Sequence, residues 1–290
     1  MKRALSLVLA LTLCLALCAC GKSDSTTASD GELTMAQVIE KSLATIGSIK
    51  SLSCTAKVDM NFSIEGQSVT NSTTMDMDLD LENGLYFMDM DIDATGEKQK
   101  MTIYMQLKGD KVDYYMLSDD RWMKMLDVDP TVLGGASIST DATEDFKLYY
   151  DMISASEDSS FELKDIDGKK CYALSAPVTL SSLEEAKKFK VDSILSSFMA
   201  DSEDAELVSQ LLAAMGPLNV VVYVDAETFM PYGFSFDFAD AIAPIFELIG
   251  QKVTVNDAKA SAIYVEYNQV TVTIPEDAKN GIDVSAFQQA

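Results

Sequence analysis

The segment Ser72–Gly96, STTMDMDLDLENGLYFMDMDIDATG, alternates methionine with aspartate on both sides of an Asn-Gly pair. Alternation with a period of two is typical of a β-strand, because successive side chains point to opposite faces of a sheet. An Asn-Gly pair between two such runs is a strong signal for a tight hairpin turn. The segment therefore predicts two antiparallel strands, with methionines on one face and aspartates on the other.

The same alternation extends from Leu52 to Met125 and predicts a six-strand antiparallel meander with one apolar, methionine-rich face. The five expected two-residue loops are Gly66-Gln67, Asn83-Gly84, Thr95-Gly96, Gly109-Asp110 and Asp119-Asp120. The registers that these loops fix on the apolar face include Cys54 with Leu79, Met75 with Ile92, Met77 with Met90, Met90 with Met101, Met105 with Tyr114, and Met116 with Met123. On the polar face, Asp78 is expected opposite Asp89, and Asp76 opposite Asp91 on one side and Lys57 on the other. Lys100 is expected opposite Asp91, and Lys98 opposite Asp93.

The rest of the chain predicts a mixture of helices and strands. Helices are expected over about 34–49, 142–154, 182–198 and 203–215. Strands are expected over 161–166 and 170–179, joined at Asp167-Gly168, then over 219–225 and 232–238, with a last pair within 252–272. The segment after Ile274 is expected to be irregular, and Trp122 is expected on the polar face beneath a helix or loop.

The N-terminus, MKRALSLVLALTLCLALCAC, has a positive start, a short apolar run, and the ending Leu17-Cys18-Ala19-Cys20. This ending resembles the lipobox of bacterial lipoproteins. The resemblance implies a signal peptide over 1–19, cleavage before Cys20, and acylation of that cysteine by palmitate-type chains. Residues 20–33 then form a flexible tether, and 34–290 a single domain. An ordinary signal peptide is the alternative reading.

Composition and residue types argue against several functions. The chain has 290 residues, 48% of them hydrophobic, and a net charge of −24, which disfavours binding to nucleic acid. It contains no histidine, the commonest general base, and no glycine-rich phosphate loop or Cys-x-x-Cys motif. The sequence therefore predicts a protein that is not an enzyme and has no cofactor.

No metal site is expected from the sequence. Asp76-x-Asp78-x-Asp80 has the spacing of a calcium loop, but Leu81 stands where glycine is needed and Phe87 where glutamate is needed. Thioethers can bind copper(I), but such a site needs a compact, exposed cluster. Ten of the 15 methionines that follow Cys20 lie between Met60 and Met125, mixed with other apolar residues on the inner face. Core packing and ligand lining both remain open for them.

The two cysteines that follow Cys20 are not expected to form a disulfide. Cys54 should point to the apolar face of the meander. Cys171 should point away from the face that carries Tyr172, Leu174 and Ala176.

Three local features together resemble the LolA-like lipoproteins, including the LppX/LprG type and an uncharacterised group in Gram-positive Firmicutes. They are the meander with Ser118–Lys124 (SDDRWMK), the turn Val224–Pro231 (VDAETFMP), and the helix pair between the two sheet portions. The resemblance implies an α+β fold: a curved antiparallel half-barrel with helices on its concave face and a possible apolar pocket.

The resulting functional expectation is a lipid-anchored protein on the extracytoplasmic face of the cell membrane that binds an apolar ligand, a lipid or acyl chain. The alternative is a non-catalytic scaffold with a filled core that supports a cell-envelope enzyme; nucleic acid is not an expected partner. The residues expected to line the ligand are Met75, Met77, Met88, Met90, Met101, Met105, Tyr114, Met116, Ile194, Phe198, Leu207 and Leu211.

Overall fold

The computed structural model describes residues 33–129, 142–179, 210, 212–248 and 250–285. The chain divides into two compact units, Met1–Thr34 and Met35–Ala290, and every helix and strand below belongs to the second. The signal peptide, Cys20 and the expected helix over 182–198 lie outside the described residues, as does most of the helix expected over 203–215.

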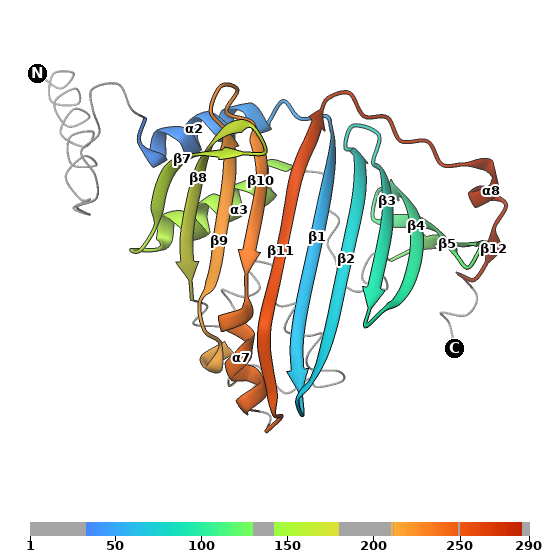
Figure 1. Ribbon diagram of the computed structural model, residues 1–290. Coiled ribbons are helices and arrows are strands. Elements are labelled where there is room, and N and C mark those ends of the chain that lie inside the picture. The colour runs from blue at the N-terminus through green and yellow to red at the C-terminus, as the bar shows by residue number, and fades with distance from the viewer. Residues whose placement is uncertain (1–32, 130–141, 180–209, 211, 249, 286–290) are drawn as a thin grey trace, which may run out of the picture. The chain divides into compact units, whose positions relative to one another are not determined.

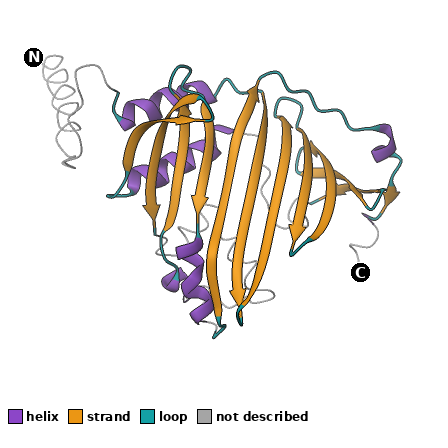
Figure 2. Cartoon of the chain, viewed as in Figure 1, coloured by secondary structure: helices purple, strands orange, loops and turns teal. Residues whose placement is uncertain are grey.

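A single twelve-stranded sheet dominates the second unit (Figures 1 and 2). Its spatial order is β12-β6-β5-β4-β3-β2-β1-β11-β10-β9-β8-β7, antiparallel throughout except for the β12–β6 pair. The strands are β1 (Ser51–Ile64), β2 (Gln67–Asp80), β3 (Leu85–Ala94), β4 (Glu97–Lys108), β5 (Lys111–Ser118), β6 (Arg121–Val128), β7 (Ser160–Ile166), β8 (Lys169–Val178), β9 (Leu218–Asp225), β10 (Pro231–Asp237), β11 (Val253–Tyr267) and β12 (Ile282–Asp283).

Helices cover one half of the apolar face. They are α2 (Met35–Ile46), α3 (Ala142–Ala155) and α7 (Ala239–Leu248), whereas the short helix α8 (Glu276–Lys279) lies on the polar face. Helix α3 packs on β8 and β9 and contacts α2, while α7 packs along β11. A buried hydrogen bond of 2.6 Å joins Ser42 of α2 to Tyr150 of α3. The predicted α+β class, a curved antiparallel sheet with helices on one face, is confirmed (Figure 2).

The meander has the predicted six strands, but two of its five registers differ from the prediction. The loops after β3, β4 and β5 are confirmed, with Met90 opposite Met101 and Met116 opposite Met123. The first turn is Glu65-Gly66, both at positive φ, so Cys54 faces Met77 instead of Leu79. The second register that differs is that of β2 with β3. Each of the two registers is shifted by two residues, so every side chain keeps its predicted face.

The β2–β3 loop has four residues, Leu81–Gly84, and is held by the last residue of β2 and by a backbone group outside the hairpin. The Asp80 carboxylate accepts the Asn83 amide N–H and side-chain N–H, and the Lys50 carbonyl accepts the N–H groups of Leu81 and Glu82.

The length of this loop shifts the pairing of β2 with β3, so Met75 faces Met90 and Met77 faces Met88. Asp76 faces Asp89 and hydrogen-bonds to Thr55, while Lys57 pairs with Asp59 instead of Asp76. The predicted Lys100–Asp91 and Lys98–Asp93 neighbours are confirmed.

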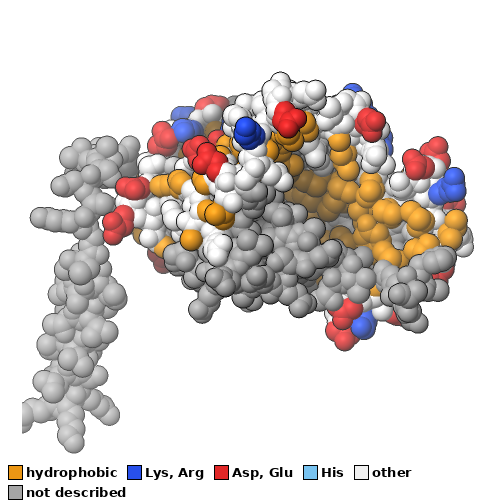
Figure 3. All heavy atoms as spheres, turned by 90° about the horizontal axis from the view of Figure 1, so that it is seen from below, with side chains coloured by type: hydrophobic (Ala, Val, Ile, Leu, Met, Phe, Trp, Pro, Cys, Tyr) orange, Lys and Arg blue, Asp and Glu red, His pale blue; other side chains and the backbone are white. Residues whose placement is uncertain are grey.

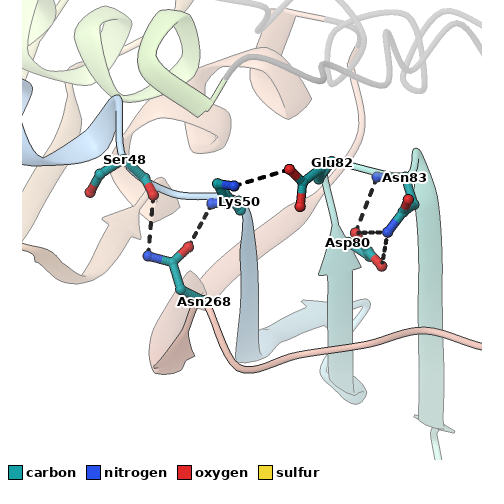
Figure 4. A network of polar contacts seen from close by, with 6 residues as sticks. All are labelled: Ser48, Lys50, Asp80, Glu82, Asn83 and Asn268. Atoms are coloured by element: carbon teal, nitrogen blue, oxygen red, sulfur yellow. Dashed lines mark hydrogen bonds and ion pairs between the residues drawn. The ribbon is translucent and has the colours of Figure 1, made fainter.

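Figure 4 shows the polar network that ties this loop to two other connections at one end of the sheet. Asn268, just after β11, accepts the Lys50 N–H at 2.6 Å and donates to the Ser48 carbonyl at 3.2 Å. The Lys50 ammonium lies 3.0 Å from the Glu82 carboxylate. The link from α2 to β1, the β2–β3 loop and the exit from β11 are therefore joined together.

The segment 252–272 contains one long strand, β11 (Val253–Tyr267), instead of the predicted pair. The Asn256-Asp257 sequence, which resembles a turn signal, lies at a β-bulge where the register with β1 shifts between Asn61 and Phe62. The Asn256 side chain donates to the Asn61 side chain at 3.1 Å and to the Ser63 hydroxyl at 2.9 Å. Strand β11 thereby pairs with β1 and β10 and joins the meander to the second half of the sheet.

Two elements near the C-terminus also differ from the prediction. Helix α7 was not predicted, although Asp237 caps its start by accepting the Ala239 N–H at 3.2 Å. The segment expected to be irregular contains α8 and β12, and β12 extends the sheet beside β6. Ile274 and Ala278 pack with Tyr115, Tyr104 and Trp122 on the polar face. The predicted cover over Trp122 is therefore confirmed.

Candidate functional site

The methionines of the meander form ordered rows across its strands. The registers define three rows on one face of β1–β6. They are Leu52–Leu79–Tyr86–Met105–Tyr114–Met125, Cys54–Met77–Met88–Ile103–Met116–Met123, and Ala56–Met75–Met90–Met101. We call eight residues in these rows the methionine face: Met75, Met77, Met88, Met90, Met101, Met105, Tyr114 and Met116.

All eight residues of the methionine face are half-buried. The other half of the same sheet face, beneath α2 and α3, is closed: Leu174, Val220 and Tyr150 are each at most 1% exposed. Tyr149 and Phe146 of α3 pack against aromatic rings of β10 and β11 in tilted and edge-on arrangements. In Figure 3, hydrophobic side chains gather in a hollow on one side of the molecule. One sheet face thus contains both a dry core and a partly accessible apolar surface.

The structure brings together eight of the twelve residues expected to line a ligand. They are the methionine face, on β2–β5. Ile194, Phe198, Leu207 and Leu211 lie outside the described residues. The prediction omitted Tyr86 and Ile103, which are buried members of the same rows. The alternation that identified the methionines also includes these two residues.

Burial, more than charge, sets the chemistry of this face. Burial, together with smaller contributions from the nearby Asp78 and Asp76 carboxylates, raises the pKa of Cys54 to about 12. The pKa of Tyr114 is also raised by burial. At neutral pH both groups are protonated and neutral, so the face presents thioethers, alkyl groups, a thiol and a phenol. Cys171 is a free, buried cysteine, as is Cys54.

The Val224–Pro231 turn contains a buried carboxylate away from the methionine face. Asp225 accepts the N–H groups of Glu227 and Thr228 at 2.8 and 2.9 Å, and its other oxygen lies 2.9 Å from the Lys169 ammonium. Burial alone would raise the pKa of Asp225, but the Thr228 N–H, Lys169 and the Glu227 N–H together lower it. This geometry closes the β9–β10 turn.

Over the described parts of the chain, no three His, Cys, Asp or Glu side chains are grouped so that they could hold a metal ion. Over the same parts, none of the helices combines the length and apolarity needed to cross a bilayer.

Three solved structures are remotely similar to this chain. LprF from Mycobacterium bovis matches with a TM-score of 0.42 and 12% identity, covering 83% of this chain and 96% of LprF. A DUF1329 family protein from Desulfovibrio piger has a TM-score of 0.23 and 7% identity, covering 81% and 93%. A β-barrel-like DUF1849 protein from Brucella abortus has a TM-score of 0.27 and 7% identity, covering 77% and 100%.

Sequence comparison places the chain in a family. No curated protein matches it significantly. The profile of one protein family matches residues 34–283, which include every helix and strand described above. The chain therefore belongs to DUF6612, a family of unknown function.

Proposed function

We propose that this protein is a lipid-anchored extracytoplasmic protein that binds an apolar molecule, a lipid or acyl chain, on its methionine face. The anchor is the acylated Cys20 that the lipobox-like ending implies. A palmitate analogue fed to the host should label the parent protein but not the Cys20→Ala variant, and an unlabelled parent would contradict the anchor.

The contrast between the two halves of the sheet face carries the proposal. Under α2 and α3 the face is sealed by side chains of the chain itself, whereas the methionine face is half-buried. Unbranched, polarizable methionine side chains adapt to irregular apolar ligands, and they are common at surfaces that bind several partners. The resemblance of the meander to LolA-like lipoproteins, which include lipid carriers, supports the same reading.

Native mass spectrometry of the chain from Gly21 onward, purified from its own host, tests the proposal. We expect a fraction of the protein to have added mass corresponding to one acyl-bearing molecule. Acid unfolding before injection should remove this added mass, which distinguishes a bound ligand from a covalent modification. Lipid extraction of the same sample should recover a molecule of the same mass.

The scaffold alternative predicts a different result. If the face is closed by the chain's own side chains, repeated preparations should give only the mass of the polypeptide. Unliganded protein from several preparations, still folded by circular dichroism, would contradict lipid binding.

A further inference from the structure

Four methionines of the methionine face form a compact group that the sequence-derived register did not predict. In the observed pairing, Met75 lies directly opposite Met90, and Met77 directly opposite Met88. Opposed residues in antiparallel strands have Cα atoms about 4.5–5.5 Å apart, and alternate residues along a strand are about 7 Å apart. The four side chains therefore leave the same face from the corners of a small rectangle. We call them the methionine square.

The expected register would have placed only Met77 and Met90 opposite each other, with Met75 and Met88 offset along their strands. With a two-residue loop at Asn83-Gly84, Met75 would have faced Ile92, and Met88 would have faced Leu79. The four-residue loop, held by Asp80 and the Lys50 carbonyl, moves the pairing by two positions and aligns both Met-Asp-Met sequences. Met101 lies beside Met90 on the next strand and adds a fifth thioether at the border of the square. The compactness that a thioether site requires is therefore present.

We propose that the methionine square binds one soft monovalent metal ion, copper(I). Thioethers are neutral, soft ligands that select copper(I) over Mg²⁺, Ca²⁺ or Mn²⁺, which prefer the carboxylates on the other face. Each methionine has three rotatable side-chain bonds, so four sulfur atoms can converge on one ion from these corners. All four side chains are half-buried, so an ion can reach them.

The surroundings of the square favour a cation held by neutral ligands. Cys54 is buried beside Met77 in the same row, outside the square. Asp76 and Asp89 lie on the opposite face of the same two strands, and the chain has a net charge of −24. This negative field attracts cations without placing a carboxylate on the methionine face.

Silver(I) tests the site, because it is a soft monovalent ion that does not change oxidation state under assay conditions. The full chain, purified in detergent in nitrate buffer of high ionic strength, is titrated with silver(I) against a chromophoric competitor. The methionine methyl groups are followed by NMR after 13C labelling. We expect saturation at one ion per chain, with the largest shifts at Met75, Met77, Met88 and Met90.

Matched variants separate this site from nonspecific binding. The triple variant M77L/M88L/M90L removes three thioethers while it keeps apolar side chains of similar volume, so the fold and the apolar surface are retained. The control M60L/M123L/M125L removes three methionines at the margins of the same sheet face. We expect the first variant to lose saturable silver(I) binding and the control to keep it. Equal binding by both variants, or no saturable binding by the parent chain, would overturn the proposal.

The leucine substitutions also keep this proposal independent of lipid binding. An apolar ligand requires hydrophobic surface, which leucine provides, whereas the metal requires sulfur. A chain that binds lipid but not silver(I) contradicts only the metal site. A chain that binds silver(I) but no lipid contradicts only the proposed function.

Discussion

At the scale of single residues, Asp225 shows how a carboxylate can be buried without a catalytic role. Its exposed fraction is 5%, yet two backbone amides and the Lys169 ammonium hold it in charged form. An unpaired charge in such a place would cost several kcal/mol. The D-x-x-T-x-x-P sequence encodes this arrangement, because the amides of Glu227 and Thr228 turn back toward the aspartate.

The substitution Asp225→Asn should destabilise the fold in a pH-dependent manner. The native pKa lies below its usual value, so the carboxylate contributes stability above the unfolded pKa of about 3.9 and loses it as pH falls through the native pKa. We expect the variant to lose about 1.5–3 kcal/mol of unfolding free energy at pH 7. Below about pH 4 its stability should decline less than that of the parent.

Urea unfolding at pH 7 and pH 3 measures this difference. Asp91→Asn is the matched control, because Asp91 also pairs with a lysine, at 3.0 Å, but its side chain is 60% exposed. That variant should show no measurable change. An equal loss of unfolding free energy in both variants would show that burial of the carboxylate does not determine its contribution to stability.

At the scale of elements, the C-terminal segment seals the polar face of β5 and β6. Lys124 donates to the Lys279 carbonyl at 2.8 Å, and the Val284 N–H donates to the Lys124 carbonyl at 3.0 Å. Gly281 makes the closest approach: an added Cβ would lie 2.9 Å from the carbonyl carbon, carbonyl oxygen and Cβ of Trp122. Only glycine fits there without movement of the segment.

Gly281→Ala should therefore loosen the segment and expose Trp122, at a cost of about 1–3 kcal/mol for overpacking. Trp122 is the single tryptophan of the chain, so its emission reports directly on this contact. We expect a red shift and stronger quenching by acrylamide, a neutral quencher. Gly47→Ala is the control, since a Cβ there meets no atom within 4 Å. Unchanged emission in the Gly281 variant would contradict the packing described.

The sequence predicted most elements because alternation fixes faces independently of exact register. It misplaced the β1–β2 and β2–β3 registers by two residues each. The β2–β3 loop length depends on Lys50, whose carbonyl reaches the loop from a distant part of the chain. It divided β11 into a pair of strands, whereas the strand continues through a bulge at Asn256 while it pairs with β1 on one side and β10 on the other. The residues within a turn or strand do not reveal which distant parts of the chain will pair with it.

At the scale of the second compact unit, one continuous sheet has two differently packed apolar halves. The sequence predicted which residue types form the candidate site and which face of the sheet they occupy, since the methionines alternate with aspartates. Its compact square was not predictable, because it depends on the β2–β3 register. The difference in burial between the halves was not predicted either, because it depends on where α2 and α3 pack, which the alternation within the strands does not encode.

Titration with an uncharged fluorescent long-chain acyl probe tests the central claim, that the methionine face binds an apolar ligand. Three chains are compared: the parent, M77Q/M88Q/M90Q, and the control D76N/D89N/D91N, which changes the opposite face of the same strands. Burial of one large apolar side chain contributes about 1.5–3 kcal/mol, so loss of three should weaken binding by more than about tenfold. We predict saturable binding by the parent and the aspartate control, and this loss in the glutamine variant. Equal affinity of all three folded proteins, or no saturable binding by any of them, would contradict the claim.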